Sequence, residues 1–443
     1  MIKFLKILFC LLIVNFFYFP TPYSFSYGYK SKELVAVVGI FLFLADMYRQ
    51  RSLTITKEFL DLLIYSVIIS LVAFFSVTFH NTQDRVYTTY FLSMLVWLSS
   101  AFVVIKCIKL VHGHITIGLV AAYIVAISTI QGLIAIIADN YAPLDNFILR
   151  TIPGLTWCKS EGRLYGFSGS ATLDTGGIRF AIASVLCMHN IKNAVEENKT
   201  RSVPLYILAF LIISVTGNIV ARTTLVGTVL GLIYLIIYIF PFRIHLSTAS
   251  LRTWLWLIAE TFIIVLIIIG LYNSDEKFRN RTRFGFEGFF SLVEKGHWQT
   301  GSNDVLADMY VFPDNPETWL IGDGRFINPE GDPNYLGEAY SGYYKNTDVG
   351  YLRFIFYFGL LGLAVYSMYI VYAGKTCIRM FPENTLLFLF LLAINFIIWF
   401  KVATDCFFIL GLFICLGYVL NFDDSLQHSR NVERGRNGAG AGA

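Results

Sequence analysis

Charged residues are scarce in this sequence, and several motifs that would mark a soluble enzyme are missing. Only 14% of the 443 residues are Asp, Glu, Lys or Arg, and the formal net charge is +4. The absence of a Walker loop, a GxSxG turn and an HExxH pair argues against a P-loop ATPase, an α/β-hydrolase and a zinc protease. No basic tract with interleaved aromatic residues is present either, so nucleic acid is not expected as a partner.

Disulfide and metal frameworks are lacking as well. The seven cysteines form no CxxC pair and show no Cys/His spacing of the kind that holds zinc. Most of them fall in or beside apolar segments, and only Cys158 lies well outside one. We therefore predict that the cysteines are packing residues and that the protein uses no metal and no other cofactor.

Apolar residues, by contrast, are abundant and occur in long runs. They make up 56% of the chain, and aromatic residues make up 16%. A membrane core about 30 Å thick requires roughly 20 apolar residues in a helix, which satisfies its own backbone hydrogen bonds. The sequence therefore predicts an all-α polytopic membrane protein with about twelve transmembrane helices. The expected spans are 4–20, 34–47, 59–79, 90–108, 115–138, 178–189, 203–217, 222–240, 252–272, 350–372, 385–400 and 405–422. The second, sixth and eleventh are short enough to be tilted or partly re-entrant.

The loops between these spans alternate between rich and poor in lysine and arginine. The richer set includes residues near both ends of the chain, such as Lys3, Lys6 and Arg430, and the positive-inside rule makes that set cytoplasmic. Both termini are therefore expected in the cytoplasm, in agreement with an even number of spans. The other side of the membrane is expected to hold two longer polar segments, 140–177 and 272–349.

The predicted organisation has four parts. Spans one to nine occupy 1–271, a large outer loop occupies 272–349, spans ten to twelve occupy 350–422, and a tail occupies 423–443. The tail ends in a Gly-Ala repeat with the composition of a linker, so it is left out of the expected fold. The large loop is rich in Phe, Trp and Tyr, which favours a folded unit lying over the membrane surface.

Two arginines stand at expected helix starts on the outer side. Asp174 or Thr175 is predicted to cap the sixth span and to leave Arg179 in its first turn. Arg222 stands at the start of the eighth span. Because a helix N-terminus attracts anions and a guanidinium group matches phosphate oxygens, the two arginines predict a pyrophosphate clamp. The alternative is that both only anchor helices at the membrane interface.

Asp348 follows the large loop and precedes the tenth span. It is predicted to cap that helix, to face an outer cavity where its carboxylate orients or deprotonates a hydroxyl group, or to do both. Further candidates for contact with a substrate are Arg163 in segment 140–177, and Arg325 and His297 in the large loop. Arg325 follows a turn that it can simply solvate, and an isolated loop histidine is usually not catalytic.

Several of these segments, taken in order, resemble one known family. They are the Gly-Arg-Leu-Tyr-Gly-Phe-Ser-Gly run at 162–169, the Ala-Arg-Thr turn at 221–223, the Ile-Gly-Asp-Gly turn at 321–324 and the Asn-Thr-Asp-Val-Gly-Tyr run at 346–351. Together with the many spans and the large outer loop, they resemble the O-antigen polymerase and ligase superfamily (Wzy-like and WaaL-like proteins). The motif resemblance covers roughly 150–365, and the resemblance in layout covers the whole chain.

The resemblance implies a metal-independent glycosyltransferase with a GT-C-like fold in the bacterial inner membrane. Its substrates would be oligosaccharides linked to undecaprenyl pyrophosphate, used at the periplasmic face, and Arg222 and Arg179 would hold the pyrophosphate. It would be an O-antigen polymerase that joins repeat units and releases undecaprenyl pyrophosphate. A Wzz-like chain-length co-polymerase and a flippase are the implied protein partners.

Two alternatives to the polymerase remain. Ligases of this family typically carry a His-Asn motif where this chain has Asn346-Thr347-Asp348, and the departure favours the polymerase over a ligase that transfers glycan to lipid A-core. A flippase for lipid-linked oligosaccharides is the third possibility. Flippases usually have short loops, whereas this chain concentrates its polar residues in one large loop.

Overall fold

The structure is a computed structural model of the chain. It describes residues 2–24, 28–50, 56–167, 173–197, 199–239, 248–327, 335 and 342–421. Within these ranges the regular structure is helical, and extended pairing is limited to two isolated bridges, Pro22–Lys30 and Ile327–Tyr343. The predicted all-α class is thus confirmed for the described part of the chain. The predicted tail, 423–443, lies outside the described residues.

Twelve helices cover the twelve apolar segments. They are α1 Ile2–Tyr18, α2 Ser31–Gln50, α3 Lys57–Phe79, α4 Tyr90–His112, α5 Ile117–Asn140, α8 Leu173–Glu196, α9 Val203–Val220, α10 Thr224–Ile239, α11 Thr248–Ser274, α16 Gly350–Met380, α17 Thr385–Ile398 and a last helix, Phe407–Asn421. We call this set the bundle. Five of its members, α3, α4, α5, α9 and α16, are long and apolar enough to cross a membrane, and the protein is therefore a multi-pass membrane protein. Three further apolar segments are shorter, so twelve crossings stay a prediction.

The sixth expected span, 178–189, is longer than predicted. Its helix, α8, begins at Leu173 and ends at Glu196, so Asp174 and Thr175 lie inside the helix and do not cap it. Gly177 lies inside the helix and allows a close approach, because a Cβ added there would overlap the hydroxyl oxygen of Thr223 in the turn between α9 and α10. The prediction that this span is short is therefore wrong, and a tilted or partly re-entrant path stays a prediction.

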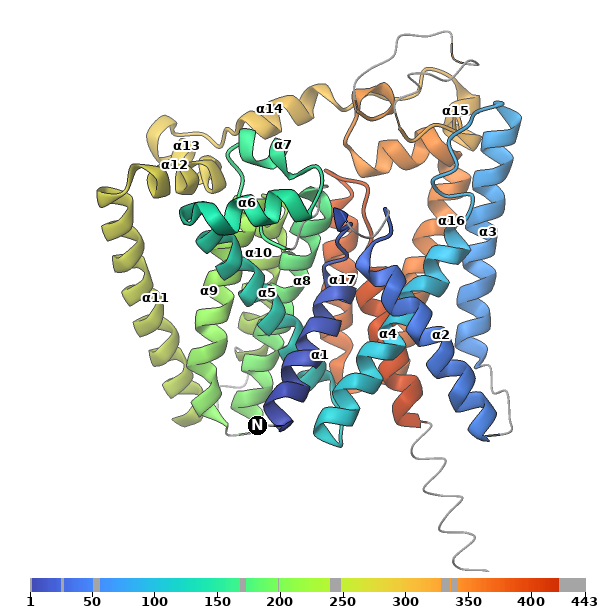
Figure 1. Ribbon diagram of the computed structural model, residues 1–443. Coiled ribbons are helices and arrows are strands. Elements are labelled where there is room, and N and C mark those ends of the chain that lie inside the picture. The colour runs from blue at the N-terminus through green and yellow to red at the C-terminus, as the bar shows by residue number, and fades with distance from the viewer. Residues whose placement is uncertain are drawn as a thin grey trace, which may run out of the picture.

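Six short helices form a polar layer at one end of the bundle. Two of them, α6 Ala142–Thr151 and α7 Leu155–Ser160, come from the first outer segment. The other four come from the large loop: α12 Glu276–Gly285, α13 Glu287–Lys295, α14 Gly301–Asp308 and α15 Pro316–Ile321. Figure 1 shows this layer at the end opposite to the start of α1 and the end of the last helix. The two outer segments therefore share one side of the molecule.

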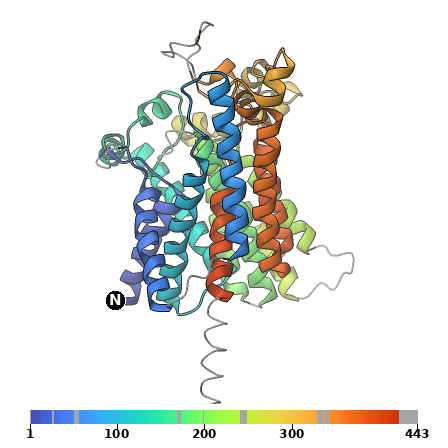
Figure 2. The same ribbon diagram turned by 90° about the vertical axis from the view of Figure 1, so that its right-hand side faces the viewer.

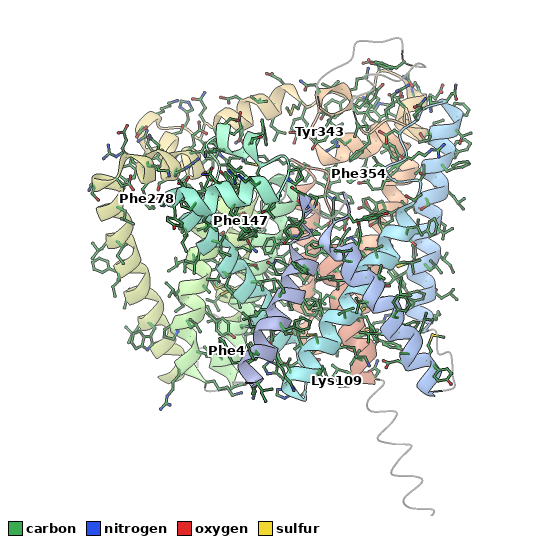
Figure 3. The ribbon with its side chains drawn as sticks, in the orientation of Figure 1. Phe4, Lys109, Phe147, Phe278, Tyr343 and Phe354 are labelled. Carbon is green, nitrogen blue, oxygen red and sulfur yellow. The ribbon has the colours of Figure 1, made fainter. Side chains whose placement is uncertain are left out.

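Helix α8 lies inside the bundle, where it packs against α5, α9, α10 and α17. On the other side of the molecule α16 packs along α3, as Figure 2 shows. Large apolar side chains such as Phe41, Leu71 and Phe262 point outward and are 68%, 60% and 63% exposed. Phe4 and Lys109 lie at the end away from the polar layer, and Phe147 and Tyr343 lie at the layer end (Figure 3). An outward apolar surface between two polar ends is what a bilayer-spanning bundle requires.

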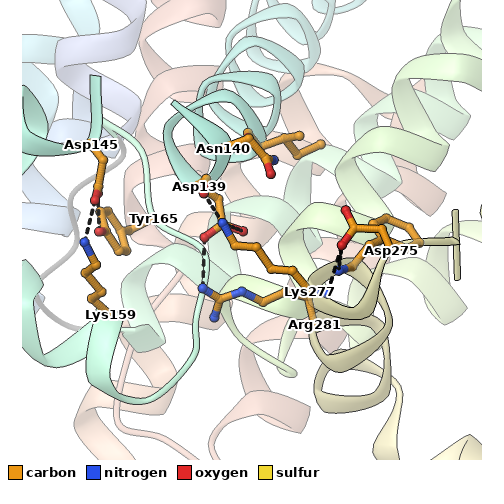
Figure 4. Close-up of polar contacts among 10 residues, drawn as sticks. Asp139, Asn140, Asp145, Lys159, Tyr165, Asp275, Lys277 and Arg281 are labelled. Atoms are coloured by element: carbon orange, nitrogen blue, oxygen red, sulfur yellow. Dashed lines mark hydrogen bonds and ion pairs between the residues drawn. The ribbon is translucent and has the colours of Figure 1, made fainter. Parts of the chain in front are cut away.

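Ion pairs join the polar layer to the bundle. Asp139 in the last turn of α5 pairs with Arg281 at 2.9 Å and with Lys277 at 3.3 Å, both on α12 (Figure 4). Within the layer, Asp145 on α6 pairs with Lys159 on α7 at 2.6 Å. These contacts connect segments far apart in the sequence and hold α12 over the outer end of α5.

A break in α16 makes a second connection to the layer. Gly359 leaves helical geometry with a φ of 68°, and a Cβ there would overlap the carbonyl of Leu320 in α15. A carbonyl freed by the break, that of Phe356, accepts a hydrogen bond from the backbone N–H of Asp323 at 2.6 Å. The break thus exchanges helical hydrogen bonds for contacts with the turn after α15. It also fixes the first half of α16, which begins two residues after Asp348.

Candidate functional site

A cavity of about 930 Å³ lies where the polar layer meets the bundle. Its walls come from α7, the turn between α9 and α10, helices α12 to α14, and the segments just before α16 and just after α17. Three of the six predicted site residues line it: Arg163, Arg222 and Asp348. Residues far apart in the sequence are therefore brought to one polar cavity at the layer end.

Arg222 reaches this cavity from the tight turn between α9 and α10. Its Nη2 pairs with Oε2 of Glu287 at 2.6 Å, and its Nη1 donates to Oγ of Ser302 at 2.8 Å. The guanidinium carbon lies 4.7 Å from the ring centroid of Phe284. The side chain is only 15% exposed, so these contacts hold the guanidinium group in one place.

Arg163 adds a second guanidinium group to the same wall. It follows α7, and its Nη1 donates to the carbonyl of Val220 at 3.3 Å. Its guanidinium carbon lies 5.2 Å from the centroid of Phe284, the ring that Arg222 also contacts. One aromatic ring therefore positions two cations by cation–π contact. Two fixed positive groups near one cavity wall favour the binding of an anion.

Asp348 lines the cavity from the segment that leads into α16. The capping residue of that helix is Val349, so the prediction that Asp348 caps it is wrong. Burial raises the pKa of the Asp348 carboxyl, while the positive charges of Arg353 and Lys401 oppose that shift. A carboxylate of raised pKa is a stronger base than an ordinary Asp. Asp348 can therefore act as a base in this cavity.

Arg179 lies elsewhere, inside the bundle. Its side chain donates to the carbonyl oxygens of Tyr18 and Thr175, and the guanidinium carbon lies 4.8 Å from the ring centroid of Phe408. The residue is 4% exposed and does not line the cavity. Because α8 begins at Leu173, the prediction of Arg179 in the first turn is also wrong. Its contacts are those of an arginine that joins α1 to α8.

Arg325 and His297 also lie outside the cavity lining. Arg325 is 7% exposed, and its guanidinium carbon lies 4.7 Å from the ring centroid of Tyr335. His297 is exposed, and its ring Nδ1 lies 3.1 Å from the carbonyl of Lys295. Neither residue therefore shares the cavity with Arg222 and Asp348.

Sequence reasoning missed the groups that complete the surroundings of Arg222. These are the carboxylate of Glu287, the hydroxyl of Ser302 and the ring of Phe284. All three come from the large loop, where no motif marks them. The one available signal was an acidic residue placed in the first turn of a short amphipathic segment, as Glu287 is in α13.

The cavity is balanced in charge, since five basic and five acidic side chains line it. Arg283 and Glu294 form one further pair at 2.8 Å, and the guanidinium group holds the pKa of Glu294 below its usual range. In the described part of the chain, no three His, Cys, Asp or Glu side chains are grouped to hold a metal ion. The cavity thus offers fixed guanidinium groups, a carboxyl of raised pKa and exposed rings such as Trp157, which is 50% exposed.

Comparison with protein-family models, with curated proteins and with solved structures finds no match to this chain. The class that the fold defines is a multi-pass all-α membrane protein with a polar layer at one end. The resemblance to the O-antigen polymerase and ligase superfamily stays a prediction from the sequence motifs.

Proposed function

We propose that this protein is a membrane glycosyltransferase of the O-antigen polymerase kind. It joins oligosaccharide units carried on undecaprenyl pyrophosphate and releases undecaprenyl pyrophosphate. One observation carries the proposal: Arg222 and Asp348, predicted from the sequence as pyrophosphate ligand and base, line a single cavity at the layer end of the bundle.

The pyrophosphate group would bind at the wall formed by Arg222 and Arg163. A leaving group that departs with its bonding electrons gains negative charge in the transition state, and a fixed cation beside it lowers the barrier. Both guanidinium groups are held against Phe284, so little reorganisation is needed when that charge develops. The position of the cavity at the end of the apolar bundle lets the polyprenyl chain remain in the membrane.

The acceptor hydroxyl would be activated by Asp348. Its oxygen attacks the anomeric carbon of the donor, and a glycosidic bond forms while the bond from that carbon to the pyrophosphate oxygen breaks. The electron pair leaves with the pyrophosphate, and the hydroxyl proton passes to the Asp348 carboxylate. The raised pKa of Asp348 suits it to take this proton.

The size and lining of the cavity suit glycans. Small-molecule sites range from about 300 to 1,000 Å³, and this cavity of about 930 Å³ is near the upper end of that range. Trp157 lines it, is 50% exposed and offers a ring face on which a sugar can stack. The side on which donors are used, the periplasmic face, follows from the resemblance and from the loop charges.

The test is an assay with purified full-length protein in nanodiscs and synthetic undecaprenyl-pyrophosphate oligosaccharide. The proposal predicts a ladder of longer lipid-linked glycans that the Arg222→Ala variant does not form. Arg150→Ala is the matched control, because Arg150 is an exposed arginine at the end of α6 in the same layer.

Two other results would replace the polymerase. Transfer of glycan only when lipid A-core is added would identify a ligase. Movement of the lipid-linked glycan across vesicles without any new glycosidic bond would identify a flippase.

A further inference from the structure

We propose that the Glu287 carboxylate occupies the position on Arg222 where an anionic ligand binds. A diphosphate group would then bind by displacing this carboxylate. The inference rests on the proposed function only for the identity of the lipid that carries the diphosphate. In physical terms, the Glu287 carboxylate competes with an anionic ligand for the guanidinium group of Arg222.

The Glu287 carboxylate is bound as a ligand anion would be. Oε2 pairs with Nη2 of Arg222 at 2.6 Å, and Oε1 accepts a hydrogen bond from the backbone N–H of Gly301 at 3.2 Å. Oγ of Ser302 accepts a hydrogen bond from Nη1 of Arg222 at 2.8 Å and so helps to fix the guanidinium group. A guanidinium group and a backbone N–H are groups with which proteins bind phosphate oxygens.

The two partners of this ion pair differ in freedom. Arg222 is 15% exposed and is held by Phe284 and Ser302, whereas the Glu287 side chain is 40% exposed. Glu287 is therefore the partner that can turn into solvent, while Phe284 and Ser302 keep the guanidinium group in place. Both residues line the cavity; the guanidinium group is the fixed partner and the carboxylate is the movable one.

The charge balance of the cavity determines how strongly it attracts an anion. With five acidic and five basic side chains in the lining, the site attracts anions only weakly until one carboxylate leaves Arg222. When the binding-competent state of a protein is only fractionally populated, the apparent affinity of its ligand is reduced by that fraction. If Arg222 is free of Glu287 about a tenth of the time, removal of the carboxylate tightens binding about tenfold. Such a device would hold a diphosphate for reaction and then help to release it.

Binding is measured by calorimetry on the full chain in phosphatidylcholine nanodiscs, with inorganic pyrophosphate and with farnesyl diphosphate as separate probes. We expect Glu287→Gln to tighten binding about tenfold relative to the wild type. Glu161→Gln, which removes the same charge from the same cavity lining, is expected to change affinity less than threefold. Glu287→Ala is measured as well, since it removes the carboxylate with a different side chain.

The gain must act through Arg222. In the Arg222→Ala background, Glu287→Gln is expected to produce no gain, which is the result that a double-mutant cycle isolates. Tighter binding of farnesyl diphosphate would show that the site takes a lipid headgroup. Tighter binding of inorganic pyrophosphate alone would show that it takes a free anion. Equal or weaker binding by both Glu287 variants, or a gain that persists without Arg222, would overturn the proposal.

The outcome is separate from that of the polymerase assay. Tighter binding by Glu287→Gln together with a wild type that forms no glycan ladder would support the competitor and reject the polymerase. A normal ladder together with unchanged binding would do the opposite.

Discussion

Arg222 and Arg179 illustrate two uses of the same side chain at one end of a helical bundle. Both lie near the start of a helix, since Arg222 comes two residues before α10 and Arg179 lies in the second turn of α8. Arg222 faces a cavity and pairs with a partly exposed carboxylate, whereas Arg179 is 4% exposed and donates to backbone carbonyls of Tyr18 and Thr175. Two arginines near helix starts can therefore have different surroundings. Arg222 lines a cavity and its partner is a side chain that can move, whereas the partners of Arg179 are backbone carbonyls inside the bundle.

The largest expected effect is that of Arg222→Ala on glycan transfer. Loss of a fixed donor to a developing oxyanion costs about 10²–10³-fold in rate, and we expect about a thousandfold loss of ladder formation. Initial rates with synthetic lipid-linked substrate measure it, with Arg150→Ala close to wild type. A loss smaller than tenfold would show that Arg222 does not stabilise the leaving group. Arg222 and Arg179 would then not differ in function.

Asp348→Asn is expected to slow the reaction about a hundredfold, as loss of a general base does. The pH profile gives a second readout. Because burial raises the pKa of Asp348, its base form appears only as pH rises through that raised pKa, so the wild-type rate should increase with pH above the range of an ordinary Asp. The profile of Asp348→Asn should lose this rise. An unchanged profile would show that another group takes the proton.

Arg179→Met should affect stability and leave ligand binding intact. The change removes the hydrogen bonds to the carbonyls of Tyr18 and Thr175 and the cation–π contact with Phe408, and each lost hydrogen bond costs about 0.5–1.5 kcal/mol. Thermal unfolding in detergent should show the loss, while pyrophosphate affinity of the folded variant stays within twofold. A loss of affinity with normal stability would place Arg179 in the binding site and contradict its purely structural role.

Gly177→Ala tests the packing that places the turn of Arg222. The new methyl group would overlap the hydroxyl oxygen of Thr223, and overpacking of this kind costs about 1–3 kcal/mol of the free energy of unfolding. Adding Thr223→Ala should recover part of that loss, because it removes the overlapping atom. Thermal melts of the two single variants and the double variant measure the recovery. Additive losses would mean that the two residues do not meet as described.

His297→Ala is expected to have the smallest effect, less than twofold on both rate and stability. The ring is exposed and lies outside the cavity, and surface changes away from special contacts usually remain within about 0.5 kcal/mol. Rate assays and thermal melts check this expectation. A large loss of rate with normal stability would contradict this expectation and give His297 a role in the reaction.

The bundle was readable from sequence because its signal is local. Apolar runs of bilayer length predicted where helices such as α3, α4 and α5 lie, and the structure has helices there. The start of α8 was misjudged because Asp174 and Thr175 are residue types that commonly cap helices, whereas here they lie inside α8. The sequence also does not show that Gly177 approaches Thr223, which lies in a turn far along the chain.

The site was predictable only in part for the same reason. Arg222 was recognisable from its position between two apolar segments, but Glu287 reaches it from a loop helix with no motif. The contact of Arg179 with the carbonyl of Tyr18 was not predicted, because Tyr18 lies on α1 and a backbone carbonyl is present at every residue. Tertiary contacts that use backbone groups are not visible to motif analysis.

The most direct measurement is a cryo-electron microscopy structure of the full chain in nanodiscs with undecaprenyl diphosphate. The account predicts the diphosphate within hydrogen-bond distance of the Arg222 guanidinium group, with the Glu287 carboxylate turned away and the Arg179 contacts unchanged. A diphosphate bound beside Arg179, or at the opposite end of the bundle, would contradict it.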